Sequence, residues 1–157
     1  MRLVLMMAVL GACHASPSER CGPAQATVKS VIDGDTIVLD DDEHVRYILV
    51  DTNEITNGHN DCYGQEAKLY NAALVEGKVV DLAYDQDCTD RFGRLLAYVS
   101  IQGREVNRLL IERGYGCVLY IPPDGAAKRA DYQAAEDEAR AAMRGMWGAC
   151  QVVACAQ

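Results

Sequence analysis

Five charged side chains stand at or near the ends of short apolar segments. They are Asp35, Arg46, Asp51, Glu54 and Arg94. A rigid scaffold usually presents its reactive polar groups from strand ends and the loops that follow them. These five residues are therefore the first candidates for a functional site.

The five side chains form a chemically coherent set. Two carboxylates with a backbone carbonyl offer the hard oxygen ligands that calcium prefers. Two guanidinium groups can hold a phosphate and stabilise the charge that builds up during phosphoryl transfer. A third carboxylate can orient or deprotonate an attacking water. The alternative is a scatter of surface ion pairs, since 24% of the residues are charged.

The spacing between Arg46 and Asp51 places a condition on the backbone. The separation of the two residues is odd, so an ideal strand would point their side chains to opposite faces. Both can reach one site only if the chain bends or leaves the strand near Asp51.

Hydrophobic periodicity predicts the elements that carry these residues. Strands are expected where β-branched and apolar residues gather, at 24–32, 36–39, 45–50, 79–84 and 95–101. Helices are expected before three glycines, at 64–76, 106–113 and 128–144. This order fits an α+β fold that is mainly β, an OB-type five-stranded barrel with three helices. The pattern alone also fits a generic α+β domain.

The first twelve residues predict an export leader. Arg2 supplies a positive charge, and residues 3–10 form an apolar run too short to span a bilayer. The run ends at Leu10-Gly11-Ala12-Cys13, which resembles a bacterial lipoprotein cleavage box, so Cys13 is the expected lipidation site. An ordinary secretory signal cut within 12–16 is the alternative. We expect residues 13–23 to form a tether and the mature protein to be exported, as a cell-envelope lipoprotein or in secreted form.

The cysteines agree with an exported domain. Seven cysteines without Cys13 leave an even set, which predicts three disulfides among Cys21, Cys62, Cys88, Cys117, Cys150 and Cys155. A zinc site made of His59, Cys62 and Cys88 is the competing interpretation, although the chain has no Cys-x-x-Cys pair.

The overall charge is unusual for a protein that holds nucleic acid. The 23 acidic residues outnumber 15 Lys and Arg and give a net charge of −8, whereas most such proteins carry a basic surface. An acidic member of that class needs its positive charge concentrated at the site, or supplied by a bound cation.

Four segments, in this order, resemble signature segments of the staphylococcal nuclease (thermonuclease) family. They are Val31–Thr36, Arg46–Glu54, Tyr63–Ala67 and Asp90–Tyr98. The resemblance runs from about Ala24 to Trp147, so we expect the domain at 24–148 and a disulfide-containing tail at 149–157. It implies the OB barrel with three helices.

The resemblance also implies roles for individual residues. Asp35 and Asp51 resemble the calcium-ligating carboxylates, and Thr52 resembles the residue that lends its carbonyl oxygen. Glu54 resembles the carboxylate that acts on the attacking water. The phosphate-binding arginines are matched by Arg46 and Arg94. Tyr120 resembles the tyrosine that packs against the nucleotide, although an ordinary tyrosine at the barrel edge fits as well.

Two residues depart from the family pattern. Asn53 stands where the family commonly has proline, so we expect a looser loop between Asp51 and Glu54. Phe92 replaces a common tyrosine and lacks its hydroxyl.

The implied function is a calcium-dependent nuclease that hydrolyses DNA, RNA or both and leaves 3′-phosphate ends. Its partner is the nucleic acid substrate, with membrane contact through the N-terminal lipid only and no protein partner implied. A non-catalytic OB-type module that binds single strands or protein is the main alternative, and such a module needs no carboxylate cluster. A disulfide-stapled surface protein without a nucleic-acid role is a third reading.

In such a barrel, the loop that leaves Glu54 and the loop that delivers Arg94 flank the same cleft. Cys62 and Cys88 lie in these two loops, so we expect them to pair and to hold the walls in register. Cys117 with Cys150 is the expected second bridge, which leaves Cys21 with Cys155.

Overall fold

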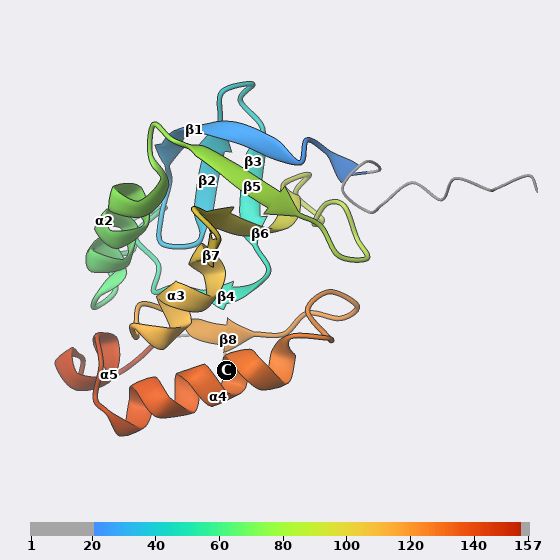
Figure 1. Ribbon diagram of the computed structural model, residues 1–157. Coiled ribbons are helices and arrows are strands. Elements are labelled where there is room, and N and C mark those ends of the chain that lie inside the picture. The colour runs from blue at the N-terminus through green and yellow to red at the C-terminus, as the bar shows by residue number, and fades with distance from the viewer. Residues whose placement is uncertain (1–20, 155–157) are drawn as a thin grey trace, which may run out of the picture.

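The computed structural model describes residues 21–154. Five strands close a barrel (Figure 1), namely β1 (Gln25–Val31), β2 (Thr36–Leu39), β3 (His44–Tyr47), β5 (Val79–Ala83) and β6 (Leu95–Ile101). The strands pair antiparallel in the order β3-β2-β1-β5-β6, and β6 closes the barrel by pairing in parallel with β3. The predicted mainly β, OB-type barrel is confirmed. The expected leader 1–12, Cys13 and Cys155 lie outside the described residues.

β1 serves two neighbours because its register shifts between Val28 and Ser30. Its first half pairs with β5 and its second half with β2. A bulge of this kind increases the local twist of a strand, which helps a short sheet to curve into a closed barrel.

The predicted strand 45–50 is broken in two. β3 ends at Tyr47, and Leu49 begins β4 (Leu49–Asp51) with a φ of 64°. A left-handed backbone at a non-glycine residue costs on the order of 1–3 kcal/mol. The Leu49 side chain is buried, and burial of a leucine contributes about 1.5–3 kcal/mol, which offsets that cost. β4 then leaves the barrel and pairs with β8 (Cys117–Leu119).

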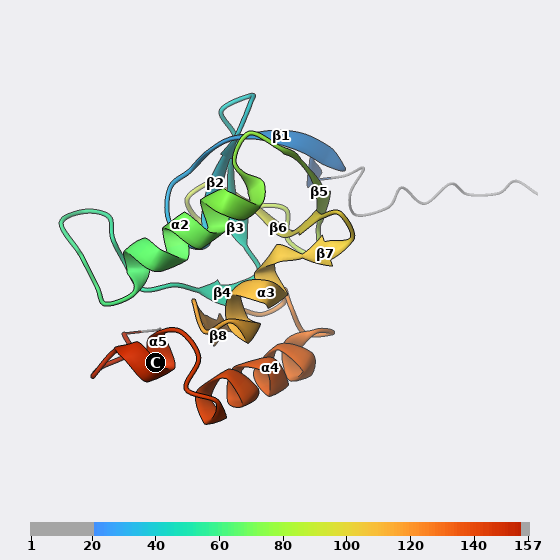
Figure 2. The same cartoon turned by 60° about the vertical axis from the view of Figure 1, so that its left-hand side comes forward.

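The helices cover one side and the lower end of the barrel (Figures 1 and 2). α2 (Gly64–Val75) lies beside the barrel, and α3 (Val106–Glu112) lies between the barrel and α4 (Arg129–Ala141). The three predicted helices are confirmed, with α4 ending three residues before the expected 144. The two-residue β7 (Arg104–Glu105) and the four-residue α5 (Met146–Ala149) were not predicted. Among residues 21–154, no helix combines the length and apolar character needed to cross a membrane.

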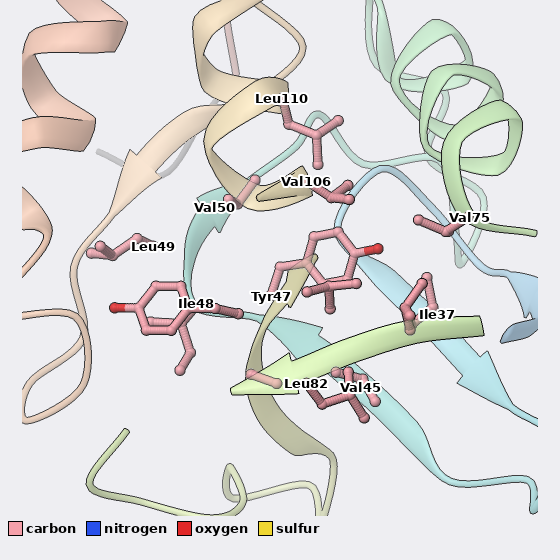
Figure 3. Packing of buried hydrophobic residues seen from close by; sticks show 14 of the residues in the cluster. Ile37, Val45, Tyr47, Ile48, Leu49, Val50, Val75, Leu82, Val106 and Leu110 are labelled. Carbon is pink, nitrogen blue, oxygen red and sulfur yellow. The ribbon is translucent and has the colours of Figure 1, made fainter. Parts of the chain in front are cut away.

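The core fills the barrel and continues under the helices. Figure 3 shows Tyr47 among strand residues, with Val106 and Leu110 of α3 on one side of it. The buried Asn107 side chain links the elements, because its Nδ2 donates to the carbonyl oxygens of Ile48 (3.0 Å) and Ala97 (3.1 Å). This amide therefore fixes the bend between β3 and β4 against β6.

The predicted disulfide pairing is wrong. Cys21 pairs with Cys88 and Cys62 pairs with Cys150, which excludes all three expected bridges, Cys62–Cys88, Cys117–Cys150 and Cys21–Cys155. Cys117 is disulfide-bonded as well. The zinc alternative is excluded too, because it needs Cys62 and Cys88 as free thiolates.

Strand register explains the first bridge. Gln25 lies opposite Asp81 in the antiparallel β1–β5 pair, so the residues before β1 run alongside the loop that follows β5. Cys21 and Cys88 lie in these two segments, with their Cα atoms 4.8 Å apart. Cys62 instead lies just before α2 and bonds to Cys150, the residue that follows the short helix α5.

Candidate functional site

The turn between β1 and β2 places Asp35 against the chain beyond β4. Asp35 is buried, and its Oδ2 accepts hydrogen bonds from the backbone N (2.7 Å) and the Oγ1 (3.0 Å) of Thr52. Gly34 permits this approach, since a Cβ there would lie 2.5 Å from Cγ2 of Thr52. The sequence Asp-Gly-Asp thus makes a turn close enough for a carboxylate to hold the neighbouring loop.

Arg46 connects the two carboxylates that the sequence singled out. Its Nη1 lies 3.0 Å from Oδ1 of Asp35, and its Nη2 donates to Oδ1 of Asp51 at 2.9 Å. Nη1 also donates to the backbone carbonyl of Val50. The bend at Leu49 makes this possible, and it meets the condition that the chain bend or leave the strand near Asp51.

Glu54 lies on the exposed loop after β4. Its Oε1 accepts hydrogen bonds from the backbone N of Ile55 (3.0 Å) and of Thr56 (2.8 Å), and from the Thr56 hydroxyl. The Thr56 hydroxyl is the main reason that the pKa of Glu54 lies below its ordinary value, and a nearby His59 adds to the effect. The carboxylate is therefore ionised at neutral pH.

Arg94 opens β6 and is held by a residue of its own loop. Its Nε and Nη2 both lie 2.7 Å from Oδ2 of Asp90. Burial raises the pKa of Asp90, but the bonds from Arg94 and from two backbone N–H groups outweigh it, so the pKa lies below its ordinary value. The Phe92 ring is 68% exposed, with the Arg94 guanidinium 5.5 Å from its centroid.

One pocket of about 520 Å³ gathers the predicted catalytic and metal residues. Its lining includes Asp35, Arg46, Asp51, Thr52, Glu54 and Arg94. A second pocket of about 510 Å³ adjoins it, sharing Arg46, Phe92 and Arg94 and adding apolar residues from β4, β8 and the chain after β8.

Tyr120 is not brought into this arrangement. It does not line either of the two pockets. It packs against the core, and the Arg129 guanidinium lies 4.5 Å from its ring centroid. Its contact with substrate stays a prediction from the resemblance.

Sequence reasoning missed two residues of the site. Asp90 had a usable signal, because it stands four residues before Arg94 with a glycine between them, a spacing that lets a turn bring the two together. Asn53 had none. The structure differs from the expected loosening of the loop: Asn53 is only 1% exposed, and its Nδ2 donates to the carbonyl of Cys62.

The pocket has an excess of negative charge around Arg46. Asp33, Asp35 and Asp51 all line it. Burial, followed by the charge of Asp35, raises the pKa of Asp33 to about 7. A carboxyl group whose pKa is raised by a neighbouring carboxylate favours a cation nearby.

The side chains at the pocket supply only some of the oxygen ligands that a hard cation needs. No cluster of three or more His, Cys, Asp or Glu in residues 21–154 is arranged to hold a metal ion. The carboxylates of Asp35 and Asp51 would therefore need completion by the Thr52 carbonyl and by water or phosphate oxygens. That all-oxygen set fits calcium, which takes carboxylate, carbonyl and water oxygens together.

Comparison with known proteins agrees with this geometry. Residues 44–149 match the family described as staphylococcal nuclease homologue. The chain belongs to this family. It is 35% identical over 128 residues to endonuclease YncB of Bacillus subtilis (strain 168), covering 77% of this chain and 60% of that protein. It is 34% identical over 128 residues to the SPbeta prophage-derived endonuclease YokF of the same organism, covering 77% and 43%.

A third relative is the thermonuclease of Staphylococcus intermedius, 37% identical over 102 residues that cover 62% of this chain and 61% of that protein. The chain thus spans between 43% and 61% of the length of these three relatives. The family match begins at residue 44 and includes Arg46, Asp51, Glu54 and Arg94. Asp35 precedes the match, and the fold brings it to the same pocket.

Proposed function

We propose that this protein is a calcium-dependent nuclease that hydrolyses phosphodiester bonds of DNA, RNA or both and leaves 3′-phosphate ends. The observation that carries the proposal is the single pocket shared by two arginines, two candidate metal carboxylates and an ionised glutamate. The names of the relatives, endonuclease and thermonuclease, point to the same chemistry.

Glu54 is the residue that acts on water. Three hydrogen bonds end on Oε1, so Oε2 is the oxygen available to accept a bond from a water in the pocket. The lowered pKa keeps this carboxylate ready to take the proton as the water oxygen bonds to phosphorus. The bond from phosphorus to the 5′ oxygen breaks, and the leaving oxygen takes up a proton from solvent.

The arginines and the carboxylates have separate tasks. Arg94 lines both pockets, so it is placed to contact the phosphate and to stabilise the charge on its oxygens. Arg46 holds Asp35 and Asp51 side by side and lines the same pocket, which supports a role for it in phosphate binding. Asp35, Asp51 and the Thr52 carbonyl would hold calcium, which neutralises phosphate charge and orients water.

Local positive charge reconciles the site with the net charge of −8. Two guanidinium groups and a bound cation at one pocket can attract a phosphate even on an acidic surface. Contacts elsewhere are expected to be weak, so binding should fall off at lower salt than in a basic relative.

Incubation with plasmid DNA and with RNA, in calcium, in magnesium or in excess chelator, tests the proposal. We expect cleavage in calcium, much slower cleavage in magnesium because it demands a tighter octahedron, and none in chelator. Labelling of the product 3′ ends should require prior removal of a phosphate from them. Binding without cleavage would favour the non-catalytic OB module, and full activity in chelator would reject calcium dependence.

We further propose that the protein is exported and anchored through a lipid on Cys13. Leu10-Gly11-Ala12-Cys13 supports this, as do the disulfides, which form in oxidising compartments. Cys13→Ser should turn a detergent-extracted protein into a soluble or unprocessed one. An unmodified mature terminus beyond Cys13, found by mass spectrometry in the native host, would reject lipidation in favour of secretion.

A further inference from the structure

The loop that carries Glu54 is closed at its base by one main-chain hydrogen bond and by two links that involve side chains. The loop begins after Asn53 and ends at Cys62, just before α2. The backbone N of Asp61 donates to the carbonyl of Glu54 at 2.9 Å, and Nδ2 of Asn53 donates to the carbonyl of Cys62. The tip between these points is exposed, so the order of the loop depends on its base.

Asn53 is held tightly between the loop and α2. A Cβ on Gly64 would lie 2.6 Å from the backbone oxygen of Asn53, so the first residue of the helix packs directly on it. The Asn53 amide is buried, and an amide in that position stabilises the structure only while its hydrogen bond is kept. The bond to Cys62 therefore fixes the spacing between the start and the end of the loop.

The disulfide Cys62–Cys150 supplies the second link. It ties the end of the loop to the residue that follows α5. Tyr63, Trp147, Cys150 and Val153 pack around the buried Met146 and Cys117 next to this bridge. Figures 1 and 2 show α5 below the start of α2 in both views, so the C-terminal segment braces the loop from outside the barrel.

We propose that Asn53 and the Cys62–Cys150 disulfide act together as positioning residues for Glu54. The inference rests on the proposed nuclease function and adds the residues that hold the Glu54 loop in place. Neither link makes a bond to the Glu54 carboxylate. Both set the backbone from which it reaches the pocket.

Loss of either link should lower kcat and leave KM nearly unchanged. The arginines at the pocket come from β3 and the start of β6, and neither link reaches these strands. A misplacement of about 1 Å of a reacting group can cost on the order of 100-fold in rate. We expect Asn53→Ala and Cys62→Ser/Cys150→Ser each to lower kcat roughly tenfold or more, with KM within about threefold.

A comparison with Glu54→Gln shows whether the effect passes through Glu54. When two changes disturb the same step, their effects on free energy do not add. In the Glu54→Gln background, Asn53→Ala and the Cys62/Cys150 pair should each change kcat by less than about twofold. The matched controls are Asn60→Ala, an exposed asparagine of the same loop, and Cys21→Ser/Cys88→Ser, a bridge elsewhere.

Asn60→Ala should match the wild type. The Cys21/Cys88 change should keep its full effect, whatever its size, when combined with Glu54→Gln. Thermal melts of each variant identify temperatures at which all of them are folded. If the cysteine variant does not fold, Asn53→Ala still tests the inference, because it keeps all disulfides.

Losses that add fully to Glu54→Gln, or that appear in KM alone, would overturn the inference while leaving the nuclease function standing. Absence of any cleavage by the wild type would overturn the function itself, and this inference with it.

Discussion

The two arginines at the pocket are positioned in different ways. Arg46 projects from a barrel strand, its side chain is 13% exposed, and it bonds to Asp35, to Asp51 and to backbone carbonyls. Arg94 directly precedes a strand, its side chain is 29% exposed, and it forms an ion pair with Asp90 of its own loop. One guanidinium is built into the fold, and the other is held at its edge.

The two arginines therefore differ in how much each contributes to stability, apart from any contribution to catalysis. Arg46 neutralises a buried carboxylate, so its removal leaves Asp35 charged and unpaired, and breaking such a pair costs about 3–5 kcal/mol. The partly exposed Arg94–Asp90 pair contributes roughly 1 kcal/mol or less to stability. If both arginines bind phosphate, only Arg94 can be removed without disturbing the carboxylates.

Arg46→Ala should have the largest effect, because it removes a proposed phosphate ligand and also the ion-pair partner of Asp35 and Asp51. We expect a loss of about 3–5 kcal/mol in the free energy of unfolding and of at least about 1000-fold in activity. Urea denaturation and cleavage rates measure the two. Arg108→Ala is the matched control, since this arginine pairs with Glu112 and Asp131 on the surface and should cost less than about 1 kcal/mol. Equal stability losses in the two variants would show that Arg46 contributes no more to the fold than a surface arginine does.

Arg94→Ala should separate activity from stability. Loss of a strong donor to the transition state is worth roughly 3–4 kcal/mol, or about 100- to 1000-fold in kcat. The melting temperature should change little, because Asp90 keeps its hydrogen bonds from the backbone N of Phe92 and of Arg94. Wild-type rates in this variant would show that the reactive phosphate lies elsewhere.

Glu54→Gln should lower turnover by roughly 100-fold, as expected when a group that takes a proton from water is lost. The glutamine oxygen can still accept the loop bonds that now end on Oε1, so folding should be intact. Single-turnover cleavage and a far-ultraviolet spectrum test both halves. Retention of wild-type turnover would mean that another group activates the water.

The sequence predicted most of the barrel because the fold obeys local rules. β2 and β6 have the predicted bounds, since their apolar runs are bordered by turn residues. The odd spacing of Arg46 and Asp51 even required the bend that Leu49 supplies. Site residues in strands or at strand ends could therefore be predicted from the hydrophobic pattern and the family resemblance.

The predictions that were wrong concern contacts between segments distant in the sequence. Cys21 meets Cys88 because of the register between β1 and β5, and Cys62 meets Cys150 because of where a four-residue helix packs. Neither register nor the place of so short a helix is encoded in local periodicity. The burial of Asn53 is similar, because a polar residue in a loop gives no sign that the fold will enclose it.

The smallest effect concerns Asp33, on the side of the pocket that Arg46 organises. Burial and the charge of Asp35 raise its pKa to about 7 in the folded protein, above the ordinary value of 3.8. The folded state therefore binds a proton more tightly than the unfolded state, and Asp33 lowers stability as the pH rises from about 4 to 7. Asp33→Asn should flatten this part of the stability profile, since its oxygen can still accept the bond from the backbone N of Asp35.

The variant should then exceed the wild type at pH 8 by an amount on the order of 1 kcal/mol, because water and counter-ions relieve part of the cost of charging Asp33. Urea midpoints between pH 4 and 8, measured in chelator so that no cation screens the carboxylates, give this difference directly. Asp42→Asn is a suitable control, because that carboxylate is exposed and its pKa is lowered by Lys29. It should lose a little stability above pH 4 instead of gaining any. Parallel profiles of stability against pH for Asp33→Asn and the wild type would show that the carboxylates around Arg46 do not repel one another. Arg46 alone would then balance their charge.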